Sequence, residues 1–380
     1  MELTRFDALA RRWADTGTRR RLLGMLAGAG AVSVAMLPEL GESPDAEGKA
    51  RRVRGEHNIR GKKAVMCIDG KTRRVPKKKR KTWLKRGATR GACTGCTPTC
   101  PANGCGMDDG CGNVCGCGAG SGCFAGTCQP CSVSCTGTPQ ACGAALQAAI
   151  DGGGDLYVCP GQYASTSGFT TTLGIGVNLY GVGSGTDPAS NTILDASGGT
   201  STVLTILKVP VGTPVTLSGL RITGGNGGNL SGGIFNYAEL TVENCAIVNN
   251  TSSGSSAAAI VSGGGLTLVN SLVEANMCTG YGAGGVELAL SGTSGDSFIT
   301  NSVITRNTGG FIGGVQVNLF DGSRSLTVDS TSQITNNTAT EPIPIAGGIA
   351  RTTPSGMVNV TGATISGNTD PQCLDVMGCP

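Results

Sequence analysis

A repeat in the second half of the chain is the feature that most limits its fold. Six short segments alternate apolar and polar residues, and their starts lie 25, 26, 31, 29 and 32 residues apart, at Val215, Leu240, Leu266, Ser297, Leu326 and Val358. The third residue of each segment is branched and apolar: Leu217, Val242, Leu268, Ile299, Val328 and Val360. Short strands that recur at this period predict the stacked coils of a β-solenoid, ~4.8 Å apart.

An asparagine recurs at the eleventh position of the same repeat. After Gly225 in the first coil, the column reads Asn250, Asn276, Asn307, Asn336 and Asn368. One coil departs from the pattern. The eighth position of the repeat is apolar in the other coils, but in this coil it is Gln333, and the apolar residue, Ile334, follows it, which indicates a one-residue insertion. Asparagine tolerates the left-handed backbone of a sharp corner, and stacked amides form hydrogen bonds between coils. The column therefore predicts an asparagine ladder.

The region before the repeats is similar to a known fold. A short helical pattern at 142–151 is followed by alternating segments at 154–163 and 177–183. Together they resemble the first coils of pectin-lyase-like proteins, and the Gly-Gly-Ile and Ile-x-x-Asn repeats are similar to those of polymorphic outer-membrane surface proteins. The resemblance implies an all-β fold over residues 142–380, a single-stranded right-handed parallel β-helix with an N-terminal capping helix. Disulfides are expected to pin this cap and to clip a loop over the last coil, through Cys142, Cys159, Cys373 and Cys379.

The N-terminus carries an export motif. Thr18-Arg19-Arg20-Arg21-Leu22-Leu23 resembles the twin-arginine signal, and an apolar stretch continues to Ala35. That stretch, of about 14 residues, is too short for a comfortable membrane span but suits a signal peptide. We predict a signal peptide at 1–37, a linker at 38–66, and a location outside the cell or on its surface. The alternative is a buried amphipathic helix preceded by arginines.

Charge divides the chain into two regions. Residues 1–144 carry 24 Lys and Arg against 11 acids, and residues 145–380 carry 5 against 14, so the net charges are +13 and −9. A basic arm can hold an anionic polymer or lipid headgroups, whereas an acidic β domain repels them. The Lys-rich run at 76–81 would read as a nuclear signal in isolation, but behind an export peptide it indicates a solvated basic patch. We therefore expect no nucleic-acid partner.

Cysteine is concentrated before the repeats. The chain has 18 cysteines, and twelve of them fall between Cys93 and Cys142. This stretch has too few large apolar residues for a core, so cross-links must hold it, and an exported protein can form disulfides. We expect a basic two-cysteine module at 67–93, which resembles a small extracellular module, and a disulfide segment at 94–141. The cysteines expected in disulfides are Cys67, Cys93, Cys96, Cys100, Cys105, Cys111, Cys115, Cys117, Cys123, Cys128, Cys131, Cys135, Cys142, Cys159, Cys373 and Cys379.

Metal binding is the competing explanation for these cysteines. Two Cys-x2-Cys pairs, at 93–96 and 128–131, have the spacing of zinc ligands, but the chain's one histidine, His57, lies outside the cluster. Calcium at Asp108 and Asp109 would have an incomplete set of ligands. We therefore favour disulfides and expect no cofactor.

The predicted register brings no catalytic cluster together. Glu243 and Asp329 share an outward column, but three coils place them ~14 Å apart, too far for paired carboxylates. A second series of strands begins at the Gly-Gly-Ile-like segment of each repeat, and there Glu287 and Gln316 are neighbours without a second acid. None of the late bases recurs beside an acid in register: Arg306, Arg324 and Arg351. The sequence therefore predicts no catalytic residue.

The resulting hypothesis is a structural, adhesive or glycan-binding scaffold, exported as a monomer. Cell-wall or extracellular polysaccharide is the expected partner of the solenoid. Aromatic residues that could stack on sugars are few, and the main candidates are Phe235, Tyr237, Tyr281, Phe298, Phe311 and Phe320. Relatives of the fold include enzymes, so the alternative is a polysaccharide lyase or glycoside hydrolase that acts on acidic polysaccharide.

Overall fold

The computed structural model describes residues 63–68, 71–86, 88–91, 105, 116–117, 120–124, 126–210, 213–290, 295–319, 323–341 and 345–379. The predicted signal peptide, with Arg19 and Arg20, lies outside these residues, as does almost all of the predicted linker. The export signal therefore stays a prediction.

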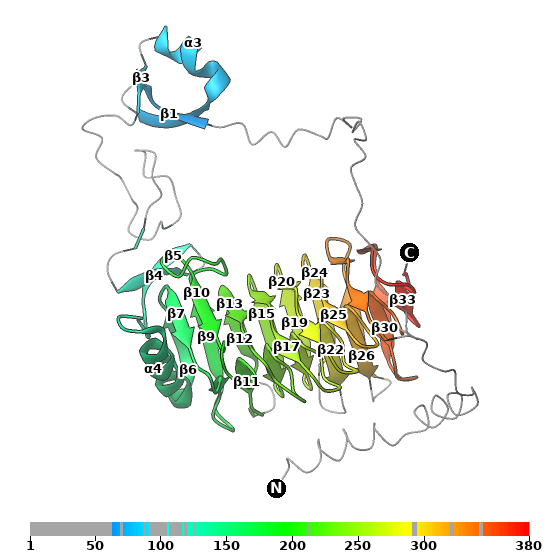
Figure 1. Cartoon of the computed structure of the whole chain (residues 1–380). Helices are drawn as coiled ribbons and strands as arrows, with labels where there is room; N and C mark the ends of the chain where they lie inside the picture. The colour runs from blue at the N-terminus through cyan, green and yellow to red at the C-terminus, as the bar shows by residue number, and fades with distance from the viewer. Residues whose placement is uncertain are drawn as a thin grey trace, which may run out of the picture. The chain divides into compact units, whose positions relative to one another are not determined.

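Three parallel sheets of eight strands each build a β-solenoid (Figure 1). Sheet 1 contains β6 (Gly154–Val158), β9 (Val177–Gly181), β12 (Val215–Ser218), β15 (Leu240–Glu243), β19 (Leu266–Val269), β23 (Ser297–Thr300), β27 (Ser325–Val328) and β31 (Met357–Val360). Sheet 2 contains β7 (Gly161–Ala164), β10 (Thr192–Asp195), β13 (Leu220–Thr223), β16 (Ala246–Val248), β20 (Leu272–Glu274), β24 (Val303–Thr305), β28 (Gln333–Thr335) and β32 (Thr364–Ser366).

The remaining strands form the third long sheet and a short fourth one. Sheet 3 contains β8 (Phe169–Thr170), β11 (Leu204–Ile206), β14 (Ile234–Asn236), β18 (Ile260–Ser262), β22 (Val286–Leu290), β26 (Val315–Leu319), β30 (Ile349–Arg351) and β33 (Cys373–Leu374). Sheet 4 contains β17 (Thr251–Ser252), β21 (Met277–Cys278), β25 (Thr308–Gly309) and β29 (Thr338–Ala339). Successive strands along the chain belong to different sheets, so each coil contributes to all three long sheets.

The inward faces of the sheets make one continuous apolar core. The predicted column on sheet 1 is in register: Leu217 pairs with Val242, Val242 pairs with Leu268, and the pairing continues to Val360. Every side chain of this column is at most 6% exposed. Burial of a Val, Leu or Ile side chain contributes about 1.5–3 kcal/mol, so these columns are a main source of stability. The parallel solenoid predicted from the repeat is confirmed.

An asparagine ladder follows sheet 2, with one correction. The Asn250 N–H and its Nδ2 both donate to Asn276 Oδ1, over 3.0 Å each. The same pattern links Asn276 to Asn307, but Asn307 then donates to Asn337 and not to the predicted Asn336. Asn368 is the last asparagine of the ladder: it accepts from Asn337, and its own N–H and Nδ2 donate to Gln372 Oε1. The inserted residue in this coil moves the ladder by one position, which is why Asn336 was the wrong assignment.

The left-handed residue of this corner precedes each ladder asparagine. Asn249, Ala275, Arg306 and Asn336 have φ values of 55°, 54°, 54° and 56°. The expectation that the ladder asparagine itself takes this conformation is therefore wrong. Its side chain serves the hydrogen bonds between coils, while its neighbour turns the chain.

A second ladder lies between sheets 1 and 2. The N–H groups of Cys245, Ser271 and Ser302 each donate to the serine hydroxyl of the next coil, at Ser271, Ser302 and Ser332. All four side chains are at most 4% exposed. This column therefore does more than fill space, because its hydroxyls satisfy buried backbone donors.

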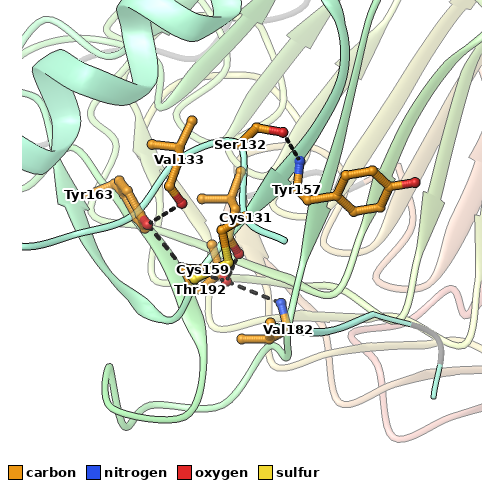
Figure 2. Close-up of a disulfide and its surroundings, with 9 residues drawn as sticks. Cys131, Ser132, Val133, Tyr157, Cys159, Tyr163, Val182 and Thr192 are labelled. Carbon is orange, nitrogen blue, oxygen red and sulfur yellow. Dashed lines mark hydrogen bonds between the residues drawn. A yellow bond between two sulfur atoms is a disulfide. The ribbon is translucent and has the colours of Figure 1, made fainter. Parts of the chain in front are cut away.

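The segment before the solenoid extends sheet 1 by one strand position (Figure 2). Val133 forms a parallel bridge with Val158 of β6. The Ser132 N–H donates to the Tyr157 carbonyl (2.7 Å), and Ser132 Oγ accepts from the Tyr157 N–H (3.1 Å). A disulfide between Cys131 and Cys159 fixes this pairing.

Helix α4 (Pro139–Gly152) follows this segment and packs against the first coil. Thr138 caps its N-terminus, because its Oγ1 accepts from the Ala141 N–H (3.3 Å). A disulfide joins the helix to Cys135. The side chains that α4 buries in the solenoid core are Cys142, Leu146 and Ile150.

The last coil is covered by residues that follow it. Strand β33 pairs with β30, and Met377 forms a parallel bridge with Asn359 of β31. A disulfide joins Cys373 to Cys379, and Arg351 forms an ion pair with Asp375 (2.7 Å). Both ends of the solenoid thus carry a segment held by disulfides.

Two small β units precede the solenoid in the chain. The first is a three-stranded antiparallel sheet of β1 (Lys63–Ile68), β2 (Lys71–Pro76) and β3 (Thr89–Arg90), with a 3-10 turn, η1 (Lys77–Lys79), and helix α3 (Arg80–Leu84). The second is the hairpin of β4 (Ser121–Phe124) and β5 (Thr127–Pro130). Across the described part of the chain, no helix is long and apolar enough to cross a membrane.

Candidate functional site

The structure identifies the disulfide partners of ten described cysteines. Besides the three pairs given above, Cys105 is joined to Cys123 and Cys117 to Cys128. Cys67 is also disulfide-bonded. Its expected partner Cys93 lies outside the described residues, as do Cys96, Cys100, Cys111 and Cys115.

These bonds bear on the zinc hypothesis. The sulfur atoms of Cys105, Cys117 and Cys128 lie within 4.8 Å of one another. All three are in disulfides, however, and so offer no thiolate to a metal. Cys128 and Cys131, which have zinc-like spacing, belong to different disulfides. Cross-linking therefore accounts for the described part of the cluster.

The acids of sheet 1 take part in local hydrogen bonds. Glu243 accepts from the Ser218 hydroxyl over 3.0 Å. Asp329 accepts from the Ser332 hydroxyl (2.6 Å) and the Thr331 hydroxyl (2.7 Å). Partial desolvation acts to raise the pKa of Asp329, but these hydrogen bonds outweigh it and lower the pKa. Asp329 therefore stabilises the turn that holds the inserted residue.

Glu287 is the most perturbed acid of the described residues. It lies on the outer side of sheet 3, where Ala257 N–H and Asn318 Nδ2 each donate to its carboxylate over 3.1 Å. Burial raises the pKa of Glu287 to about 7, against the lowering effect of these two hydrogen bonds. Its neighbour in register is Gln316, as the sequence predicts. Acid pairs need two carboxyl groups, so this site does not supply the arrangement of a glycosidase.

The late arginines occupy separate positions. Arg306 forms an ion pair with Glu274 beside the asparagine ladder. Arg351 donates to the Gly356 carbonyl (2.7 Å) in addition to its ion pair with Asp375. Arg324 lies just before β27. The structure therefore gives Arg306 and Arg351 local structural partners.

The basic module, residues 63–91, concentrates positive charge. It contains 12 Lys and Arg and one acid, Asp69. A small core fills the space between its sheet and α3, through Met66, Ile68, Val75 and Ala88, with Trp83 and Leu84 packed against it. The apolar side chains thus occupy the interior, and the cationic side chains are exposed: Arg73, Arg74, Lys77, Lys78, Lys79, Lys81, Lys85, Arg86 and Arg90.

Trp83 adds an aromatic surface to this module. Its ring is partly exposed, and the Arg86 guanidinium lies over it at 5.5 Å from the ring centroid. Such cation–π contacts hold an arginine in place without neutralising its charge. The module can therefore present several cations from one folded surface, which is the requirement for binding an anionic polymer or headgroup layer.

The outer face of sheet 1 carries two outward-facing columns, most of whose side chains are partly exposed. The first runs through Asp155, Asn178, Thr216, Thr241, Thr267, Phe298, Thr327 and Asn359. The second runs through Tyr157, Tyr180, Ser218, Glu243, Val269 and Thr300. The sequence reading missed Tyr157 and Tyr180, because the first coils precede the regular repeat. The alternation of apolar and polar residues within 154–158 and 177–181 is the sequence signal that could have identified both tyrosines as outward-facing.

The aromatic residues chosen from the sequence do not form one surface. Phe235 and Tyr237 pack edge to face at 5.0 Å, and Tyr281 stacks on Phe311 at 5.3 Å. Phe298 is 42% exposed on sheet 1, while Phe320 lies outside the described residues.

No family model, curated protein or solved structure matches this chain.

Proposed function

We propose that the protein is an exported attachment scaffold. The basic module binds an anionic surface, either a polymer or lipid headgroups, and the solenoid holds a polar face at a fixed spacing for contact with glycans or neighbouring surfaces. The observation that carries this proposal is the excess of 12 cations over one acid in the module of residues 63–91, in a chain whose residues 145–380 are acidic.

The solenoid supports the scaffold part of the proposal. Its core columns and ladders repeat from coil to coil, and Glu243, Asp329, Arg306 and Arg351 take part in local contacts. In this proposal the solenoid is right-handed, α4 acts as its N-terminal cap, and the chain reaches its oxidising location through the motif at Arg19 and Arg20. An oxidising compartment is where disulfides of this density persist.

The test measures binding of the full-length protein to anionic vesicles and to a soluble polyanion. Lys77, Lys78 and Lys79 are replaced together by Gln, and the matched control replaces the same three residues by Arg. We expect the Gln variant to bind at least about tenfold more weakly, because three exposed charges are lost, and the Arg variant to bind like the wild type. Vesicles of phosphatidylglycerol and soluble dextran sulfate distinguish headgroups from polymers.

Salt provides the second measurement. Added salt shortens the Debye length from about 10 Å at 0.1 M to about 3 Å at 1 M, so binding through exposed lysines must weaken over this range. Binding that is insensitive to salt, or equal in the Gln and Arg variants, would contradict the attachment proposal. Vesicles of phosphatidylcholine serve as the uncharged control.

A further inference from the structure

Two tyrosines on the outer face of sheet 1 form an aromatic step. Tyr157 of β6 and Tyr180 of β9 occupy the same position on neighbouring coils, and their rings stack with centroids 5.3 Å apart. Phe124 of β4 packs edge-on against Tyr157 at 5.1 Å. Figure 2 shows the Tyr157 side chain directed away from the Cys131–Cys159 disulfide. Both tyrosines are partly exposed, so the step is accessible from solvent.

The column beyond Tyr180 continues with smaller, polar residues. Ser218 pairs with Tyr180, and Glu243 pairs with Ser218. Because the tyrosine rings stack from coil to coil, the second face of Tyr180 is directed toward the coil of Ser218. The serine side chain is much shorter than a tyrosine ring, so its column leaves the second face of Tyr180 uncovered, and the Glu243 carboxylate, which accepts from the Ser218 hydroxyl over 3.0 Å, borders this face. The column therefore presents an aromatic face, a hydroxyl and a carboxylate in succession.

The adjacent column supplies further polar groups at the same spacing. Asn178 Nδ2 donates to Asp155 Oδ1 over 2.8 Å, and Asn178 Oδ1 accepts from the Thr216 N–H over 2.7 Å. Thr216, Thr241 and Thr267 are in register and partly exposed. Hydroxyl groups can both donate and accept, so this column can pair with the hydroxyls of a sugar chain.

Charge decides which sugar chain fits. Asp155 and Glu243 flank the tyrosines, and the two columns of sheet 1 contain no Lys or Arg among the described residues. The electrostatic environment is negative at this point: besides burial, the carboxylates of Asp155 and Glu243 raise the pKa of Tyr180. An anionic polysaccharide would be repelled. A neutral sugar ring offers an apolar face to tyrosine and hydroxyl donors to the carboxylates.

We propose that the Tyr157–Tyr180 step and the adjoining threonine column bind a neutral polysaccharide, with one sugar ring stacked on Tyr180 over Ser218. The inference rests on the proposed binding role of the solenoid and deepens it by naming the site and the class of ligand. It also separates the two partners of the chain: the basic module takes the anionic surface, and sheet 1 takes the neutral glycan.

The test measures retention of the full-length protein on a panel of neutral polysaccharides, cellulose, chitin, xylan, mannan and β-glucan, with pectate as the acidic comparison. Tyr180→Ala removes the stacking face, and we expect about tenfold weaker binding, which corresponds to about 1.4 kcal/mol. Tyr180→Phe keeps the ring and should bind like the wild type. Ser218→Gln fills the space beside the ring and should weaken binding with both tyrosines present. Tyr281→Ala, which removes a tyrosine that is 48% exposed and lies outside sheet 1, is the matched control and should change nothing.

Several results would overturn the proposal. They are equal retention of Tyr180→Ala and wild type, retention on pectate alone, and no retention on any neutral polysaccharide. Circular dichroism and unfolding midpoints establish that each variant is folded. Binding to anionic vesicles is measured on the same proteins and should be the same for Tyr180→Ala and wild type. A failure of the glycan site and a failure of the attachment proposal therefore give different patterns.

Discussion

The two adjacent asparagines of the coil with the insertion offer a sharp test of the solenoid's register. Asn337 is 1% exposed and holds four side-chain hydrogen bonds. Its Oδ1 accepts from the N–H and Nδ2 of Asn307, and its Nδ2 donates to Ile304 O and Asn368 Oδ1. Asn336 is exposed and has a φ of 56°. Both residues are asparagines, but Asn337 is buried in the ladder whereas Asn336 is exposed at the corner.

The magnitude follows from the groups left without partners. In Asn337→Ala the buried Asn307 N–H loses its acceptor, and Ile304 O loses this donor. The four lost hydrogen bonds contribute about 1 kcal/mol each, so we expect a loss of roughly 3–5 kcal/mol. Asn336→Gly keeps a residue that accepts the left-handed backbone, so its effect should stay within about 1 kcal/mol.

Urea unfolding followed by circular dichroism measures both variants. A midpoint that falls strongly for Asn337→Ala and little for Asn336→Gly, with similar slopes, would support the ladder. If Asn336→Gly were as damaging as Asn337→Ala, the ladder would pass through Asn336 and the placement of the insertion would be wrong. Asn307→Ala, one coil earlier, should behave like Asn337→Ala.

Three further predictions concern the acid on sheet 3, the disulfides and export. The raised pKa of Glu287, about 7 in the folded state against 4.5 as the ordinary value, means that the folded protein binds the proton more tightly; its contribution to stability is full below the ordinary pKa and is lost as the pH rises through about 7. As the pH rises from about 4.5 to above 7, the unfolding midpoint of the wild type should therefore fall relative to that of Glu287→Gln. If the midpoints of the two proteins changed with pH in the same way, the raised pKa of Glu287 would be refuted. Removal of the Cys131–Cys159 disulfide, with a separation of 28 residues, should cost more than removal of Cys373–Cys379, with a separation of 6. The loop-closure relation gives about 3.6 and about 2.2 kcal/mol, and denaturant unfolding of the two double Cys→Ser variants compares them, with the reverse order counting against this reasoning. Replacement of Arg19 and Arg20 by Lys should leave the protein inside the cell, as measured by cell fractionation, and unchanged export would refute the twin-arginine assignment.

The parts of the fold that repeat were predictable from the sequence. Branched side chains at one position per coil have no other place than the core, so the register from Leu217 to Val360 follows from their spacing alone. The ladder failed in one coil, because an insertion between Val328 and Ile334 leaves two neighbouring asparagines that sequence cannot tell apart. Only the hydrogen bonds identify Asn337 as the buried one.

The less regular parts were not predictable in detail. Cysteine spacing indicates cross-linking but does not determine pairing, since the partners of Cys142 and Cys159 come from a segment whose path depends on the folded first coil. The tyrosine step was missed for a related reason. Tyr157 and Tyr180 lie 23 residues apart in coils that precede the regular repeat, so they meet only when both strands are placed in sheet 1.

The disulfides at the two ends also bear on how the molecule associates. A strand at the limit of a sheet has unpaired backbone groups that can pair with another chain. In sheet 1 those groups on β6 are met by residues around Val133, and those on β31 by residues around Met377, through only a few hydrogen bonds each. The bonds Cys131–Cys159 and Cys373–Cys379 keep both segments in place. Loss of the two bonds would weaken the cover of both edges, and a more exposed strand edge favours pairing with a second chain.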